Sequence, residues 1–452
     1  MSDELRERFR QAAVELVAPG AAAADEQGRF DRNAFGQLGE RGLLRAFAPQ
    51  AFGGEGLGLR GAAAAIEGLA MGSDDLGFTV SVMAHLVATQ LLVEHADAAQ
   101  QARWLPRLLS GEWLAGVANS EPRAGTDVLG LRSRARPSGD DFALSGRKRS
   151  ITNVGEADLL LVSARLSGVS AREAINAFVL ELPAAGAYVR PIRDLTGLRS
   201  SPTGDLLLRG VSVPGVARLG EVGSGVELFR STFSWERLLC GYVFLATLRR
   251  AQLRALTHAE EREQFGQAIG RNQHVQERIV RMHVAEQLLF AHLAATLDAA
   301  CAGRDVFGAL SVIKIYGLEA ALDAAQSLVR ILGGRGLRRQ AAAEKMLRDV
   351  VTLSVFGGTV ELHKSIAYSE LVRRRAAPPA PAAPSEPEFE LLSAAQLSPR
   401  VVAELTALVA DALPARAELC GRYYFDTPPD EVLLARRAGQ LIGFRAISYR
   451  EL

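Results

Sequence analysis

The chain has 452 residues, of which 48% are hydrophobic and 23% are charged, and its formal net charge is +1. This length suggests two to four domains, and the hydrophobic share suffices for a sizeable core. The balanced charge leaves no electrostatic footprint for nucleic acid or a membrane surface, so we expect neither partner. The three cysteines lie far apart and form neither a zinc motif nor a disulfide framework, which favours buried thiols in a reducing cytoplasm.

The first part of the chain has the periodicity of amphipathic helices. It lacks the basic start and apolar run of a signal peptide, and no window approaches the roughly 20 uncharged apolar residues of a membrane span. We therefore expect a soluble, cytoplasmic protein. Residues 1–113 are predicted to form an N-terminal helical domain with helices over 3–18, 31–47, 60–71, 74–95 and 104–109.

The pattern changes between residues 114 and 220, where short apolar runs are separated by Gly, Pro, Asp and Ser. Such runs are typical of short strands in a β-barrel or sandwich. The clearest of them cover residues 114–118, 159–164, 177–182 and 205–208. No βαβ alternation occurs, and no Gly-x-Gly-x-x-Gly follows a strand, so a Rossmann sheet is not expected.

Long helical segments return over residues 221–376, and the short loops between them predict a C-terminal four-helix bundle. The predicted helices cover 226–264, 272–302, 305–332, 340–355 and 359–375. The fold class is therefore an α+β multidomain protein. Residues 377–388 read as a Pro/Ala linker.

Residues 389–452 form a separate small segment. A hairpin is predicted around Ala438-Gly439, after a helix over 401–413. This segment resembles the start of a GNAT-type acetyltransferase, but the chain ends before any pyrophosphate loop of that family. We expect a remnant, a partner-docking piece or the beginning of a larger protein, rather than a complete acetyltransferase.

The central and C-terminal regions also carry a series of short motifs. They are the run from Ser120 to Asp127, the run from Gly146 to Asn153 with Ala157-Asp158, Arg190 to Ser201, Val213-Pro214, Arg262-x-x-Phe265-Gly266, Gln273, Leu332 to Gly336, Arg348-Asp349 and Gly358-Thr359. Each motif is weak alone. Together, in this order and over residues 3–375, they resemble the acyl-CoA dehydrogenase family.

This resemblance implies FAD as the cofactor. The hydroxyls and amides around Ser120, Thr126, Ser150 and Thr152 suit the polar edge of an isoalloxazine ring, and Gly125 permits close backbone approach. Without the resemblance, these would be ordinary turn residues. It further implies that Ile151, Arg262, Phe265, Gln273, Arg330, Gly333, Gly334, Thr359 and Glu361 bind FAD. Some of these reach an adjacent subunit, which implies a homodimer or homotetramer.

Desaturation of a thioester requires a base for the α-proton, an acceptor for the β-hydride and donors for the thioester oxygen. In most of the family, the base is the glutamate of a Glu-Gly-Thr motif, and the matching position here is Gly357. A minority, isovaleryl-type branch places the base on an earlier helix. The position that matches it is Glu236, so the resemblance implies that Glu236 is the base and that Gly357 supplies a backbone N–H.

The helical pattern around Glu236 supports this assignment. Glu236 shares an apolar face with Phe233, Cys240 and Val243, and a carboxylate on such a face is costly unless it has a function or a partner. Desolvation there would raise its pKa toward the range of a general base. The alternative is a buried structural ion pair. Gly357 would leave room for a carboxylate from the other helix.

The expected function is FAD-dependent α,β-dehydrogenation of a short acyl thioester, with the proton going to Glu236 and the hydride to flavin N5. The thioester is acyl-CoA or an acyl-carrier protein, as in enzymes of polyketide and peptide antibiotic pathways that the chain resembles. Trp235 and Arg237 are candidate substrate-binding residues. Electron-transfer flavoprotein or another acceptor would receive the electrons, and no metal is expected.

Two alternatives remain open at this point. One is a flavin-dependent monooxygenase or oxidase on the same fold, which is favoured by Ser150, where the family usually has an aromatic residue, and by Gly357. The other is a non-catalytic homologue that binds a carrier protein.

Overall fold

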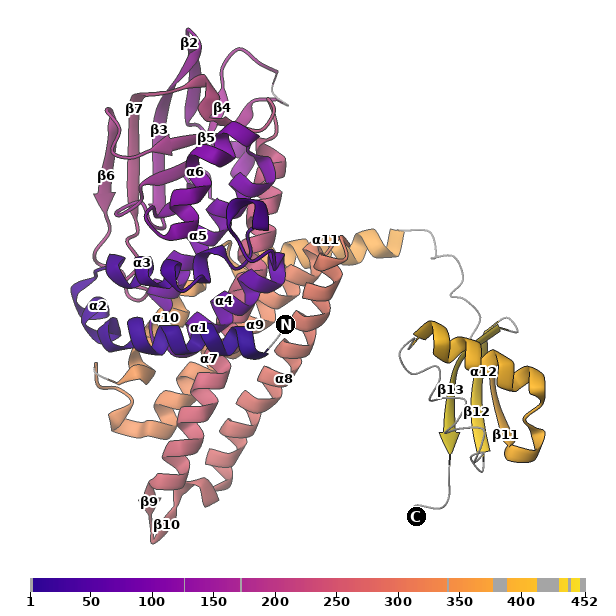
Figure 1. Ribbon diagram of the computed structural model, residues 1–452. Coiled ribbons are helices and arrows are strands. Elements are labelled where there is room, and N and C mark those ends of the chain that lie inside the picture. Colours follow the sequence, from indigo (N-terminus) through magenta and orange to yellow (C-terminus); the bar gives the residue numbers. More distant parts are fainter. Residues whose placement is uncertain are drawn as a thin grey trace. The chain divides into compact units, whose positions relative to one another are not determined.

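The computed structural model describes residues 3–125, 127–170, 173–339, 341–376, 388–412, 431–437 and 440–447. The chain divides into two compact units, Met1–Glu370 and Leu371–Leu452 (Figure 1). The first unit contains the helical, sheet and bundle regions, which share one continuous hydrophobic core. The second unit has a small core of its own around Leu405 and Leu434. The expected α+β architecture is confirmed.

The first unit begins with a layer of helices. They are α1 (Asp3–Leu16), α2 (Ala21–Gln27), α3 (Arg32–Glu40), α4 (Gly58–Gly72), α5 (Leu76–His95) and α6 (Ala98–Ser110). Asp75 caps α5, and Asp97 forms a capping box with Gln100 at the start of α6. The sequence pattern joined residues 31–47 into one helix, but α3 ends at Glu40 because Gly42 adopts a left-handed φ of 86°.

Helix α5 runs through the middle of this unit. It is long and apolar enough to cross a membrane, which corrects the expectation that no window comes close to a membrane span. However, 83% of its apolar window is buried inside the protein, as in the core helix of a soluble fold. Its all-round apolarity therefore reflects contact with other helices and with the sheet on every side.

The central region is an eight-stranded sheet with the order β6-β7-β3-β2-β4-β5-β8, and β1 pairs in parallel with β4. Its strands are β1 (Ala115–Ala118), β2 (Arg134–Ser138), β3 (Asp141–Ile151), β4 (Leu159–Leu166), β5 (Ile175–Glu181), β6 (Ala187–Pro191), β7 (Gly204–Val213) and β8 (Arg218–Leu219). The apolar runs indicated β1, β4, β5 and β7. They did not reveal the largely exposed β2 and β6, or β3, whose residues are mostly outside the core.

The bundle region consists of α7 (Gly225–Glu261), α8 (Gln273–Cys301), α9 (Phe307–Leu332), α10 (Ala342–Leu353) and α11 (Val360–Ala376). A small hairpin, β9 (Glu263–Gln264) and β10 (Gln267–Ala268), joins α7 to α8 at the end of the bundle that lies away from the sheet (Figure 1). Helix α7 packs against α4, α5, α8 and α9, so it connects the N-terminal helices to the bundle.

The second unit contains β11 (Glu388–Ser393), α12 (Pro399–Ala412), β12 (Glu431–Arg437) and β13 (Gln440–Ile447). Antiparallel pairing of β12 with β13, which closes at Arg437 and Gln440, confirms the predicted hairpin. The turn residues Ala438-Gly439 and the predicted linker residues 377–387 lie outside the described residues. The resemblance of this segment to an acetyltransferase stays a prediction.

Helix α5 joins the sheet through His85, whose side chain is fully buried. Its Nδ1 accepts a hydrogen bond from the Ala115 N–H at 3.0 Å, and its Nε2 lies 3.1 Å from the Leu108 carbonyl. This arrangement fits the neutral ring, with the proton on Nε2. Burial lowers the pKa of His85 to about 3.

We predict that His85 makes the first unit sensitive to mild acid. Above pH 6.5, its ordinary pKa, the ring is neutral in both states, but below it only the unfolded chain takes up the proton. At pH 5 this linkage removes about 2 kcal/mol from the free energy of unfolding. The melting temperature, measured between pH 7 and pH 5, should therefore fall more steeply for the wild type than for His85→Asn. Equal slopes would contradict the assignment.

Candidate active site

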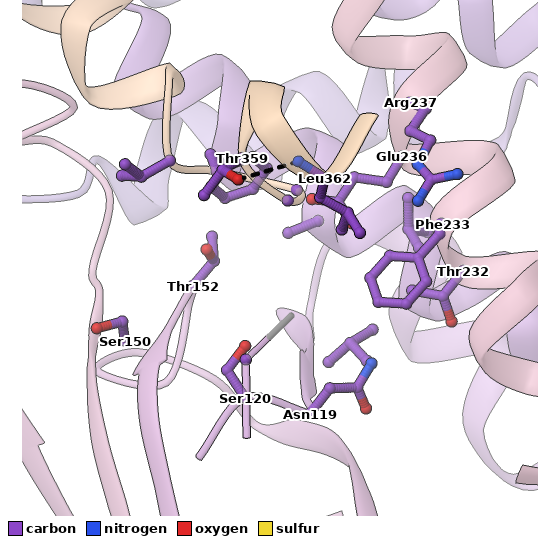
Figure 2. Close-up of a pocket in the computed structure, with 18 of the residues that line it drawn as sticks. Asn119, Ser120, Ser150, Thr152, Thr232, Phe233, Glu236, Arg237, Thr359 and Leu362 are labelled. Carbon is purple, nitrogen blue, oxygen red and sulfur yellow. Dashed lines mark hydrogen bonds between the residues drawn. The ribbon is translucent and has the colours of Figure 1, made fainter. Parts of the chain in front are cut away.

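A cavity of about 530 Å³ lies within the first unit, where the sheet, α5, α7 and the loop before α11 meet (Figure 2). The sheet contributes Ser120, Ser150 and Thr152, and α7 contributes Glu236 and Arg237. Figure 2 shows the sheet residues on one side of the space and the α7 residues on another. The cavity therefore joins residues that are more than a hundred positions apart in sequence.

The sheet side of the cavity presents hydroxyls that form no hydrogen bond with any described residue. The side-chain oxygens of Ser120, Ser150 and Thr152 make no hydrogen bond to any described residue. At Gly125, an added Cβ would meet nothing within 4 Å, so the backbone lines open space. Free hydroxyls and open backbone fit the polar edge of a flavin ring. Ile151 also lines the cavity, whereas Thr126 lies outside the described residues.

Glu121 explains why the Ser120 loop lies against the sheet. Its carboxylate accepts hydrogen bonds from the backbone N–H groups of Arg132 and Ser133, at 2.6 and 2.9 Å, and from Lys148 Nζ at 2.9 Å. Lys148 is fully buried on β3 and also donates to the Asn119 carbonyl at 3.1 Å. The glutamate of the Ser-Glu-Pro motif is thus an anchor for the loop, and it does not face the cavity.

Glu236 reaches the cavity from α7, directly beside Gly357. A Cβ added at Gly357 would lie 2.8 Å from Glu236 Oε1 and 3.3 Å from its Cδ, so a side chain at position 357 would collide with the carboxylate. Burial raises the pKa of Glu236, and the cations Lys314 and Arg237 only partly oppose this effect. No hydrogen bond or ion pair to another described residue engages this carboxylate, which disfavours a structural ion pair.

Arg237 also lines the cavity, and it forms no ion pair with Glu236. It is only 4% exposed, and its Nε and Nη1 have no hydrogen-bond partner among the described residues. Its guanidinium lies over the rings of Phe307 and Phe233, with 4.6 and 5.5 Å to the ring centroids. Burial lowers its pKa, with Glu236 acting in the opposite direction.

The structure places Trp235 outside this cavity. Its Nε1 donates to Glu94 at 3.2 Å, and its ring contacts Phe47. Successive positions on a helix point about 100° apart, so Trp235 faces the N-terminal helices while Glu236 faces the cavity. Trp235 is therefore not among the residues that line this cavity, and its contact with the substrate stays a prediction.

The predicted cofactor residues separate into two groups. Thr359 lies at the cavity, where its hydroxyl accepts from the Leu362 N–H at 3.4 Å (Figure 2). By contrast, the lining of this cavity does not include Glu361, Arg262, Phe265, Gln273, Arg330, Gly333 or Gly334. Glu361 is exposed, and its lowered pKa comes from its own backbone N–H and then from Thr359.

The remaining residues lie toward the far end of the bundle. Arg262 precedes the β9–β10 hairpin, which Figure 1 shows at this end of the bundle, and Gln273 follows it at the start of α8. Phe265 lies in the turn of the hairpin and is fully exposed. Arg335, in the glycine turn after α9, is close enough to His258 to lower its pKa together with Arg262, although burial contributes most. Arg262 and Arg335 therefore lie near each other at this end of the bundle, with Glu261 beside them, and the predicted FAD-binding residues Gly333 and Gly334 lie next to Arg335, away from the cavity of the same chain.

Several lining residues were not predicted from sequence. Asn119, Thr232, Phe233 and Phe307 complete the walls, together with residues of α5 such as Met83. Phe233 was noted only as a neighbour of Glu236 on its helical face. Thr232, four residues before Glu236 on α7, and Asn119, next to Ser120, could have been found by the same spacing. Met83 and Phe307 carry no local signal, because α5 and the start of α9 reach the cavity only through tertiary packing.

Family models of known proteins match nearly all of the first unit. Residues 2–112 match the family model of the acyl-CoA dehydrogenase N-terminal domain, residues 116–211 match that of the middle domain, and residues 223–372 match that of the C-terminal domain. These three matches fall on the helical layer, the sheet and the bundle.

Curated relatives agree. The chain is 35% identical, over 358 residues, to L-prolyl-[peptidyl-carrier protein] dehydrogenase of Pseudomonas fluorescens, which covers 78% of this chain and 93% of that protein. It is 30% identical, over 371 residues, to mitochondrial isovaleryl-CoA dehydrogenase of Pongo abelii, which covers 80% of this chain and 86% of that protein.

Solved structures of similar proteins have the same fold. The structure of PigA with FAD and proline has a TM-score of 0.79 at 25% identity and covers 83% of this chain and 99% of that one. The prolyl acyl carrier protein oxidase AnaB has a TM-score of 0.78 at 27% identity and covers 81% and 98%.

The proximity of Gly357 to Glu236 yields a prediction about stability. Gly357→Ala forces an alanine into a φ of 65° and also places its Cβ against the carboxylate. The matched control is Gly303→Ala, at a φ of 70° with nothing within 4 Å. We expect the control to cost about 1 kcal/mol of unfolding free energy, and Gly357→Ala to cost about 0.5–1.5 kcal/mol more, because the Glu236 carboxylate must turn away from the new Cβ. Equal losses in thermal unfolding would show that the carboxylate does not occupy this space.

Proposed function

The chain belongs to the acyl-CoA dehydrogenase family, and we propose that, within this family of FAD-dependent dehydrogenases of acyl thioesters, it uses Glu236 as its catalytic base. The observation that carries this proposal is a partly buried carboxylate that has no hydrogen-bond or ion-pair partner among the described residues and that faces the cavity beside a glycine. A carboxylate in that state has the raised pKa that a general base requires near neutral pH.

The protein groups around the cavity have separate tasks. Glu236 removes the α-proton of the acyl group, and a double bond forms between Cα and Cβ. The backbone N–H of Gly357, which donates to no described residue, supports the thioester oxygen as negative charge develops on it. When bound, FAD accepts the hydride from Cβ. The hydroxyls of Ser120 and Thr152 would hold its ring.

The walls beside Glu236 favour a short acyl group. The cavity of about 530 Å³ would have to hold both the flavin ring and the acyl group, and Phe233 and Phe307 line it together with Glu236. Because these rings also pack against the Arg237 guanidinium, they cannot easily move aside for a longer chain.

We further propose that the acyl group is delivered by a carrier protein. The 35% identical relative acts on a prolyl group held by a peptidyl-carrier protein, and AnaB is an oxidase of a prolyl acyl carrier protein. The isovaleryl-CoA dehydrogenase of Pongo abelii, at 30% identity, is somewhat less similar.

The electron acceptor has two candidates. Electron-transfer flavoprotein is the acceptor expected from the family, whereas the likeness to AnaB favours molecular oxygen. The exposed Ser150 at the cavity supports the second candidate, because a small side chain at this position leaves the adjoining space open. Oxygen consumption and hydrogen peroxide formation during turnover would distinguish an oxidase from a dehydrogenase.

We also propose that the protein forms a homodimer or homotetramer. Val280, Val284 and Leu288 follow one another at four-residue intervals on α8, and each is about half exposed or more. Such an apolar stripe on a long helix is suited to contact with a second copy. The end of the bundle around Arg262 and Arg335 would then be available to a cofactor pyrophosphate of an adjacent subunit.

The base assignment is tested by Glu236→Gln, with Glu227→Gln as the matched control on the exposed first turn of the same helix. In anaerobic stopped flow with an acyl thioester, we expect reduction of the bound flavin to slow by at least about 10³-fold in Glu236→Gln, because the α-proton loses its acceptor. The control should keep the wild-type rate. Full-speed reduction in Glu236→Gln would eliminate this carboxylate as the base.

The choice of thioester is tested by attaching the same acyl group either to a carrier protein or to CoA. Prolyl and isovaleryl groups, each attached to a peptidyl-carrier protein and to CoA, are compared by kcat/KM. We expect a preference of about tenfold or more, equivalent to roughly 1.4 kcal/mol, for the carrier-bound form, because the carrier surface adds contacts. A preference for CoA with both acyl groups would overturn the carrier proposal and leave the dehydrogenase assignment intact.

A further inference from the structure

A buried lysine donates hydrogen bonds to backbone carbonyls at the end of α10 and in the turn that follows it. Lys314, on α9, is fully buried, and its Nζ donates to the carbonyls of Leu353 at 3.1 Å and of Phe356 at 2.7 Å. Its ammonium makes no ion pair with a carboxylate of the described residues, and the Phe244 ring lies 5.3 Å away. A buried charge whose hydrogen bonds go only to main-chain carbonyls indicates that these carbonyls need a fixed position.

A histidine holds the next carbonyl of the same turn. His363, on α11, has its Nε2 at 3.2 Å from the Gly357 carbonyl and its Nδ1 at 3.4 Å from Ser311 Oγ. Burial, with Arg237 next in importance, lowers the pKa of His363 to about 4, so the ring is neutral at physiological pH. Because a carbonyl only accepts, the proton lies on Nε2.

Fixing these carbonyls also fixes the direction of two N–H groups. In a trans peptide, the C=O and the following N–H point in opposite directions within one plane. Lys314 therefore orients the Gly357 N–H through the Phe356 carbonyl, and His363 orients the Gly358 N–H through the Gly357 carbonyl. Both glycines line the cavity, and neither N–H donates to a described residue.

The conformation of this turn depends on its glycines. Gly357 and Gly358 have φ values of 65° and 92°, which place both in a region that residues with a side chain rarely adopt. Two consecutive glycines also give the turn many alternative conformations. Without Lys314 and His363, the orientation of the N–H groups would be poorly defined.

We propose that Lys314 is a positioning residue for the reaction, which directs the Gly357 N–H at the thioester oxygen and holds its positive charge behind Glu236. This role rests on the proposed function, because it presupposes a thioester in the cavity. Lys314 contacts neither substrate nor base, and it acts through the carbonyl of Phe356 and through its electrostatic field.

The electrostatic effect of Lys314 on Glu236 can be measured separately from its effect on the Gly357 N–H. Charged or titratable groups that face Glu236 are Arg237 and Cys240 on α7, Lys314 on α9 and, through the Gly357 turn, His363 on α11. Of these, Lys314 and Arg237 lower the pKa of Glu236 against the effect of burial. Removal of the ammonium should therefore raise this pKa, and the acidic limb of the kcat/KM profile should move to higher pH.

The test compares Lys314→Met with Lys364→Met. Lys364 is an exposed lysine on α11 that pairs with Glu319 at 3.1 Å, so its loss controls for the general effect of removing a lysine. In the full-length, FAD-loaded protein, we expect Lys314→Met to lower the rate of flavin reduction about 10- to 100-fold, with little change in KM, since a misdirected oxyanion donor acts mainly on the transition state. The acidic limb should shift upward only in this variant.

The outcomes of this test distinguish the proposed role of Lys314 from the proposed function of the protein. If the wild type reduces its flavin with a thioester and Lys314→Met does so at the same rate with the same pH profile, Lys314 has no positioning role. If none of the thioesters reduces the flavin of the wild type, the proposed function is wrong, and the proposed role of Lys314 is wrong with it. A loss of rate with an unchanged acidic limb and a raised KM would indicate a purely structural lysine and would also overturn the proposal.

A second variant covers the case in which Lys314→Met does not fold. Lys314→Gln keeps an N–H donor for the carbonyls but removes the charge. Amide hydrogen exchange of residues 354–359 should then stay within about threefold of the wild type, because the turn is still held. We expect the acidic limb in Lys314→Gln to shift upward nevertheless. An unshifted limb with a protected turn would exclude the electrostatic role.

Discussion

The carboxylate of Glu236 occupies the cavity because position 357 has no side chain. This steric constraint brings together two elements that are distant in sequence: α7, which carries the carboxylate, and the turn between α10 and α11, which leaves the space. It also explains the electrostatic state of the carboxylate. Since the neighbouring wall is bare backbone, no side-chain donor or cation of the described residues lies in hydrogen-bond contact with Glu236, and burial dominates its pKa.

Two buried lysines support opposite walls of this cavity in similar ways. Lys148, on β3, holds the Asn119 carbonyl and the Glu121 carboxylate, and thereby fixes the loop that presents Ser120. Lys314, on α9, holds carbonyls of the turn that presents Gly357. In both cases the lining groups are small or are backbone atoms, which cannot anchor themselves by packing. A charged hydrogen bond from a rigid strand or helix supplies the missing constraint.

The site residues that could be predicted from the sequence are those that stand out from their neighbours in the chain. Glu236 could be found because a single carboxylate interrupts the apolar face of a long helix, and Gly357 could be found because it replaces a glutamate expected from the resemblance. By contrast, Lys314 looks like any polar residue of an amphipathic helix, and its buried position depends on three other segments. Trp235 shows how helical rotation separates neighbours in sequence, since it faces Glu94 while Glu236, the next residue, faces the cavity.

The 2.8 Å separation between Glu236 Oε1 and the missing Cβ of residue 357 also limits how such a site can evolve. The two positions compete for one volume, so their substitutions are coupled by epistasis. A glutamate at position 357 would share this volume with one at position 236, so the Glu236 side chain would have to turn away. A chain that first replaces a glutamate at position 357 by glycine passes through a form without a base, so the order of the two substitutions decides whether activity is kept.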